Sequence, residues 1–232
     1  MSDGAAPALR ELAPGLWRWT ARHPEFHPPG FEEVACFALH DAAGTVLVDP
    51  LVSEGDEALL DALDGVVDGS QGRVRIVITV PYHVRSAEPL WRRYRDRRET
   101  CILGHPRTGE RLSDRHGFRL LEPGVMLDGD LVAHAIGRPR RQEMPVWLPS
   151  HAALAFGDAV LETGGGLRVW DDPLDSPKRE RWYRERYVPT LEALLVHDVQ
   201  RVLVTHGEPV LDGARAALED ALRQPPWSRR AA

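Results

Sequence analysis

The stretch "ITVPYHVRSAEPL", residues 78–90, gives the first indication of the fold. The mainly apolar residues 75–79 that lead into it are typical of a buried β-strand, and residues 87–94 have the pattern of a helix. Between them lies a short turn that carries His83. Ligands and catalytic groups of α/β proteins gather where strands end, so this strand–turn–helix unit predicts a functional site around His83.

Bulk properties narrow the class of protein. The chain has 232 residues, of which 43% are hydrophobic and 28% charged, as is ordinary for a globular protein with a substantial core. A formal net charge of −6 argues against general nucleic-acid binding, for which a strongly basic domain is usual. Cys36 and Cys101 are too few for a disulfide framework. Without an evident signal peptide or a long apolar run, the sequence predicts a soluble cytoplasmic protein.

The order of predicted elements indicates two similar halves. Predicted strands cover residues 15–21, 34–51 (a hairpin that turns at residues 42–44), 73–80, 100–106, 131–137, 143–149, 153–162 and 201–207. Predicted helices cover residues 53–67, 86–98, 178–197 and 211–224. Two β-rich sheets with helices outside predict a layered α/β sandwich. No clear linker divides the chain, which favours one domain over residues 1–232, with halves of about 1–120 and 121–232.

Four segments place polar groups where a predicted strand ends. They are "TVPYHVRS" (79–86), "AIGRPRR" (135–141), "FGDAV" (156–160) and "VTHGEPV" (204–210). A lone histidine at a strand end is more often structural than functional. Four such segments in this order are a stronger indication of a site at one edge of the sheets.

These segments resemble the metallo-β-lactamase superfamily. The resemblance covers nearly the whole chain and includes "ELAPGLWRWT" (11–20) and "TVLVDP" (45–50). The family pattern is an HxHxDH turn, a histidine in a PGHT-like turn, an aspartate in a GD dipeptide and a histidine after a late strand. Those groups bind two metal ions, commonly zinc. The resemblance therefore implies a hydrolase built as a four-layer αβ/βα sandwich.

Only part of the family pattern is matched. His83 stands at the second histidine of the turn, Asp158 at the GD aspartate and His206 at the late histidine. At the other four ligand positions the sequence has Pro81, Arg85, Ser86 and Arg138. Proline and arginine cannot ligate a metal, because proline has no donor and guanidinium stays protonated. The resemblance thus implies a reduced metal site.

One interpretation is a hydrolase with an atypical metal site that acts on an ester, thioester, amide or lactone. His83, Asp158 and His206 would be the catalytic residues and would hold one zinc or other divalent ion, whose bound water is the nucleophile. Arg85 or Arg138 would stabilise the oxyanion. The partner is a small molecule in this interpretation, with no role for nucleic acid or membrane.

The alternative is a catalytically inactive or metal-free member of the fold that binds a small anionic ligand. Tyr82, Arg85, Arg138 and Arg140 would form its pocket, since guanidinium groups bind carboxylate or phosphate in bidentate fashion. Either His83 or His206 would be a general base there. An ion pair of Arg85 or Arg138 with Asp158 that only fills an inactive site is a third possibility. The sequence predicts no oligomeric state.

Several other residues are assigned supporting roles. Asp49 resembles an aspartate that supports the family's site without binding metal. A proline-rich loop is expected either to form a pocket rim or to be exposed, and it carries His23, Phe26, His27 and Phe31. Trp147 is predicted to be a core aromatic residue, and His134 a structural histidine inside a strand.

Overall fold

The structure, a computed structural model, describes residues 9–23, 31–128, 130–137 and 141–228. Its larger sheet has seven strands in the order β1-β2-β3-β4-β5-β6-β7. These strands are β1 (Arg10–Ala13), β2 (Leu16–Arg22), β3 (Glu33–Asp41), β4 (Gly44–Val48), β5 (Arg73–Ile78), β6 (Thr100–Gly104) and β7 (Phe118–Leu120). The first four are joined antiparallel, and β4 to β7 run parallel.

The second sheet has five strands in the order β14-β11-β10-β9-β8. They are β8 (Met126–Leu127), β9 (Leu131–Ala133), β10 (Val146–Leu148), β11 (Ala153–Phe156) and β14 (Arg201–Val204). A separate hairpin joins β12 (Val160–Glu162) to β13 (Leu167–Val169).

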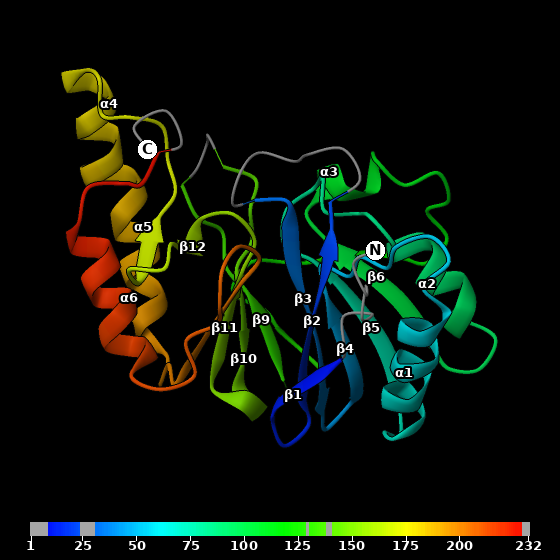
Figure 1. The fold of residues 1–232 in the computed structure, drawn as a ribbon. Helices are drawn as coiled ribbons and strands as arrows, with labels where there is room; N and C mark the ends of the chain where they lie inside the picture. The colour runs from blue at the N-terminus through cyan, green and yellow to red at the C-terminus, as the bar shows by residue number, and fades with distance from the viewer. Residues whose placement is uncertain (1–8, 24–30, 129, 138–140, 229–232) are drawn as a thin grey trace, which may run out of the picture.

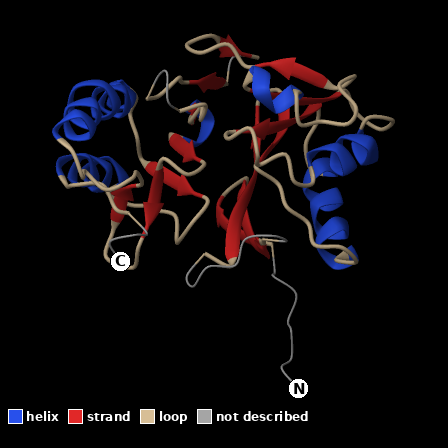
Figure 2. Cartoon of the chain, turned by 90° about the horizontal axis from the view of Figure 1, so that it is seen from above, coloured by secondary structure: helices blue, strands red, loops and turns tan. Residues whose placement is uncertain are grey.

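Helices cover the outer faces of both sheets. They are α1 (Glu57–Asp68), α2 (Ala87–Tyr94), α3 (Pro106–Gly109), α4 (Pro177–Trp182), α5 (Val188–Glu192) and α6 (Ala214–Arg223). Short 3-10 segments cover Pro149–His151 and Ala193–Val196. Figure 1 shows α1 and α2 beside the first sheet and α4 to α6 beside the second, and Figure 2 shows the strands between these helical layers. Within the described ranges, none of the helices has the length and apolar character that crossing a bilayer requires.

Three apolar clusters hold these layers together. One packs α1 and α2 on the first sheet and contains Ile76, Leu63 and Leu90. Another packs α5 and α6 on the second sheet. The third lies between the sheets and contains Val77 and Leu203. Because neighbouring residues of β5 belong to opposite clusters, this strand is apolar on both faces, as is typical of a parallel strand covered on both sides. The predicted four-layer αβ/βα sandwich is confirmed.

Two predicted elements are divided in the structure. The strand predicted at 153–162 ends at Phe156, because the N–H groups of Gly157 and Asp158 bind the Glu143 carboxylate instead of a neighbouring strand. The helix predicted at 178–197 contains a π-helical segment, Tyr183–Tyr187, directly before α5. Pro189 explains this interruption, since proline has no N–H to continue the helix and collides with the carbonyl four residues earlier.

Strand register brings three of the predicted site residues to one edge. In the parallel pair of β11 and β14, Phe156 lies opposite Val204. Asp158 lies two residues after Phe156, and His206 lies two residues after Val204. Both therefore stand beyond the same end of this strand pair. His83 stands beyond the end of β5, where the chain turns into α2. The side chains can therefore meet across the gap between the two sheets.

Candidate functional site

Asp49 fixes the turn that carries His83. This aspartate follows β4, is 2% exposed and has the unusual φ of +46°. Its carboxylate accepts the backbone N–H of Thr79 at 2.8 Å and also the Thr79 hydroxyl. His83 Nδ1 lies 3.0 Å from Oδ2 of the same carboxylate. A carboxylate on Nδ1 holds the ring so that Nε2 faces away from it. The predicted supporting role of Asp49 matches these contacts.

Asp158 is the centre of the site. His83 Nε2 lies 3.5 Å and His206 Nε2 lies 3.6 Å from the same oxygen, Oδ1 of Asp158. The other oxygen, Oδ2, accepts the Tyr82 hydroxyl at 2.8 Å. Both histidines are buried, at 3% and 6% exposure, whereas Tyr82 is 55% exposed. We call these four residues the Asp158 centre.

Charges within the centre stabilise one another. Burial and the charge of Arg85 lower the pKa of His83, but the carboxylates of Asp158 and Asp49 outweigh them and raise it to about 9. Burial raises the pKa of Asp158, but the two imidazoles outweigh it and hold that pKa well below its usual range. At neutral pH the centre is therefore an aspartate that faces a protonated His83.

His83 predicts a pH dependence of stability. A pKa raised from 6.5 to about 9 in the folded protein contributes stability that is fully present below about pH 6.5 and is lost as the pH rises through about 9. We expect urea denaturation of the wild type to show this loss between pH 6.5 and 9.5, and His83→Gln to lack it. An equal loss in the variant would contradict the assignment, and His116→Gln, an exposed histidine, is the control.

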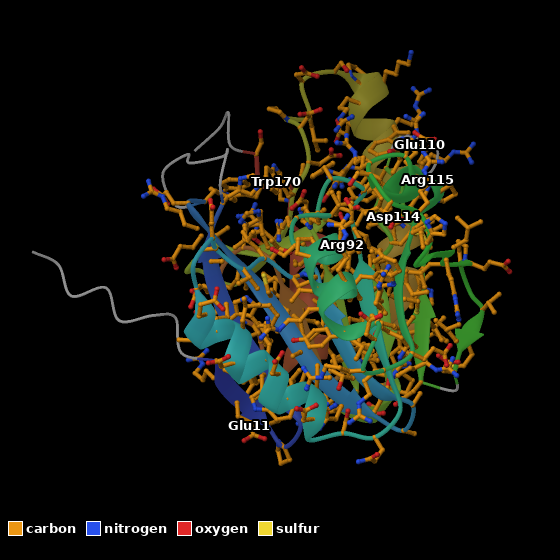
Figure 3. All side chains as sticks on the ribbon, turned by 90° about the vertical axis from the view of Figure 1, so that its right-hand side faces the viewer. Glu11, Arg92, Glu110, Asp114, Arg115 and Trp170 are labelled. Carbon is orange, nitrogen blue, oxygen red and sulfur yellow. The ribbon has the colours of Figure 1, made fainter. Side chains whose placement is uncertain are left out.

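A cavity of about 570 Å³ opens beside the centre. Tyr82 and Asp158 line it, so a ligand would meet these two before the buried histidines. The other walls include Arg141, Glu143, Trp170, Asp171, Arg179 and Trp182. Trp170, labelled in Figure 3, lies in the upper part of the molecule in that view, at the opposite end from Glu11 of β1.

Two arginines of the cavity share one carboxylate. Arg179 forms an ion pair with Asp171, and Arg141 Nη2 lies 3.6 Å from the same oxygen. Arg141 Nη1 also lies 3.7 Å from Glu143. Burial raises the pKa of Glu143 to about 7, and the charge of Arg141 only partly offsets it. These contacts join the polar side of the cavity to its tryptophans, because Arg141 also donates to the Trp170 carbonyl and the Arg179 guanidinium lies 5.1 Å from the centroid of the Trp182 ring.

The predicted site residues have different outcomes. His83, Asp158, His206 and Tyr82 lie together as described above. Arg85 does not pair with Asp158: its Nη1 donates to the backbone carbonyl of Asp49 at 3.3 Å, and the ion pairs found for Asp158 are with the two histidines. The proposed pairing of Arg85 with Asp158 is therefore wrong. Arg138 and Arg140 lie outside the described residues.

Some wall residues were not predicted from the sequence. They lie after β13: Trp170 and Asp171 stand between β13 and α4, and Arg179 and Trp182 belong to α4. This segment carries no family motif. Phe31, from the proline-rich loop, is buried and packs on His206 with ring centroids 4.8 Å apart. Phe31 is therefore not exposed, although it is not among the residues that line the cavity, and Phe26 and His27 lie outside the described residues.

Comparison with solved structures identifies the class of fold. A metallo-β-lactamase from Pontibacter korlensis matches with a TM-score of 0.62 and 14% identity, covering 94% of this chain and 100% of that one. A β-lactamase domain protein from Burkholderia ambifaria matches at 0.61 and 20% identity, over 94% and 76% of the chains. A metallo-β-lactamase from Hirschia baltica matches at 0.60 and 14%, over 93% and 96%.

The chain therefore has the metallo-β-lactamase fold. At these identities the likeness establishes the fold alone. No protein-family model matches the sequence, and no curated protein matches it.

The side chains at the family's ligand positions decide whether the two metal ions that this fold implies could bind here. Pro81 offers no donor, and Arg85 donates to a backbone carbonyl. The Ser86 hydroxyl accepts the N–H of Val52 at 2.9 Å, so it serves the backbone. Across the parts of the chain that the structure describes, no three His, Cys, Asp or Glu side chains form a group that could hold a metal ion. The residues present thus do not fit a binuclear centre, and the single ion on His83, Asp158 and His206 stays a prediction.

Proposed function

We propose that the chain is a hydrolase of small esters, thioesters or lactones that uses the side chains of the Asp158 centre in place of a metal pair. The observation that carries this proposal is the convergence of two buried imidazole nitrogens on Asp158 Oδ1, while Tyr82 binds Oδ2 at the cavity wall. Such an array holds a charged acid–base group in one orientation beside a cavity that can take a substrate.

Each residue has a distinct role in this proposal. Asp158 takes a proton from a water molecule as that water adds to the acyl carbon. Tyr82 gives its hydroxyl proton to the departing oxygen or sulfur, and Asp158 returns the water's proton to Tyr82, so the proton count closes. Arg141, which lines the same cavity, stabilises the oxyanion. His83 and His206 keep Asp158 ionised and oriented, while Asp49 orients His83.

The same chemistry limits the substrate class. Asp158 is a weak base because its pKa lies well below the usual range. An alkoxide or thiolate is a far better leaving group than the amine of an amide. We therefore place amides, which the sequence also allowed, outside the substrate range.

The test is hydrolysis of p-nitrophenyl acetate by tag-free protein. Asp158→Asn removes the proton acceptor and is expected to lower kcat/KM by about 100-fold, within the usual range for loss of a general base. Asp172→Asn is the matched control, because Asp172 lines the same cavity but is exposed and does not touch the centre. Equal loss in the two variants, or none in Asp158→Asn, would overturn the assignment of the centre.

Binding of a small anion without turnover is the second candidate. Arg141 and Arg179 line the cavity, although both already contact Asp171. Absence of hydrolysis, together with calorimetric binding of inorganic phosphate that Arg141→Gln weakens, would favour this candidate over the hydrolase.

A further inference from the structure

Two histidines face each other at the outer side of the second sheet. His134 directly follows β9, and His197 ends the 3-10 segment Ala193–Val196. Their Nε2 atoms are 2.9 Å apart, and the two rings meet edge to face with centroids 4.9 Å apart. Neither residue has a part in the Asp158 centre or the cavity.

Both imidazoles are suited to metal binding in their charge state. Burial, helped by the neighbouring His197, lowers the pKa of His134 to about 4, and burial lowers the pKa of His197. Neutral imidazole is the form that ligates metals. In the hydrogen bond between the two rings, one Nε2 carries the hydrogen and the other accepts it. A neutral ring can carry its proton on Nδ1 instead, and its Nε2 is then free to bind a metal.

Geometry also favours a shared cation. Two nitrogen ligands about 2.0–2.1 Å from one metal and at a right angle to each other lie about 3 Å apart. The observed separation of 2.9 Å, at which the two rings are hydrogen-bonded to each other, matches that distance. Trp147 stacks on His197 with an interplanar angle of 8° and a centroid distance of 4.7 Å, which fixes that ring. The backbone N–H of His134 donates to Pro145 at 2.9 Å, which fixes the other residue.

The surroundings leave room for further ligands. Both histidines are partly exposed, so water can complete the coordination sphere. Asp198 adds a nearby carboxylate, which now binds Gln200. The only guanidinium that contacts His197 among the described residues, Arg215, donates to backbone carbonyls and pairs with Glu219.

We propose that His134 and His197 form a two-histidine site for a late first-row divalent cation, with water as the remaining ligands. Imidazole suits Cu²⁺, Ni²⁺ and Zn²⁺, and Cu²⁺ binds most tightly in this series. The bound ion would link β9 to the outer helical layer that also carries the cavity residues Arg179 and Trp182. This site is independent of the proposed hydrolase function.

The test is a Cu²⁺ titration followed by tryptophan fluorescence, because Trp147 stacks on His197. We expect the tryptophan fluorescence of the wild type to be quenched, with saturation near one equivalent of Cu²⁺. The same result is expected for the exposed-histidine control, His116→Gln, and for the double variant His83→Ala/His206→Ala. His134→Gln and, separately, His197→Asn should each weaken binding by at least about tenfold.

A second measurement covers the case in which one variant is unstable. Zn²⁺ should raise the Tm of the wild type and leave that of the two site variants unchanged, since binding to the folded state stabilises it. Copper binding that is equally tight in His134→Gln and His197→Asn would overturn the proposal. So would loss of binding only in the His83→Ala/His206→Ala variant.

Discussion

Asp49→Ala is expected to lower the free energy of unfolding by about 3–5 kcal/mol, because it leaves several buried donors without an acceptor. Asp49 is 2% exposed and accepts hydrogen bonds from the Thr79 backbone, the Thr79 hydroxyl and His83. The substitution also leaves protonated His83 without one of its two carboxylate partners. Urea denaturation monitored by circular dichroism measures the change.

Two further variants separate these contributions. Asp49→Asn keeps an acceptor of the same shape and should cost less than Asp49→Ala, while lowering the pKa of His83. Asp61→Ala, on the exposed side of α1, should change stability little. A loss below about 1 kcal/mol in Asp49→Ala would show that the turn does not depend on this carboxylate.

Arg75→Ala is expected to cost a similar amount, about 3–5 kcal/mol, by leaving a buried carboxylate unpaired. Arg75 lies within β5, and its ion pair with Asp41 is fully buried, with both side chains 0% exposed. Asp41 also accepts the N–H groups of Ala43 and Gly44 in the turn before β4, so the pair joins β5 to that turn.

A double-mutant cycle tests this ion pair. Because Asp41→Ala also removes the turn bonds, it should cost more than Arg75→Ala. The combination Asp41→Ala/Arg75→Ala should cost clearly less than the sum of the single variants, since neither charge is then left alone. Additive losses would contradict a direct interaction. Arg119→Ala, an exposed arginine of β7 in the same sheet, is the control.

Much of the fold followed from local patterns. The hairpin of β3 and β4, the helix α1 and the strand–turn–helix of β5 and α2 were predicted because apolar periodicity and turn residues agree there. The prediction failed where a distant group decides the structure. β11 ends where the N–H of Gly157 binds the Glu143 carboxylate. Glu143 belongs to another segment of the chain, so the local sequence around Gly157 does not reveal this contact. Pro189, by contrast, was a local signal against one continuous helix.

The site was predictable only in its motif residues. His83, Asp158 and His206 follow strands, so strand order places them at one edge. The partner of Arg85 was not predictable, because its φ of +29° and its bond to the Asp49 carbonyl depend on the exact path of the turn. The cavity wall of Trp170, Asp171 and Arg179 depends on how the outer helices pack, which local sequence does not specify.

The Asp158 centre is proposed to work without a metal ion, so hydrolysis should not depend on bound metal. The zinc, iron and manganese of tag-free protein are measured by mass spectrometry, and p-nitrophenyl acetate hydrolysis is followed before dialysis against EDTA, after it, and after zinc is added back. We predict the same rate in all three states, with no metal that His83→Ala/His206→Ala specifically loses. About one equivalent of metal absent from that double variant, with activity that falls in EDTA and returns with zinc, would contradict the claim.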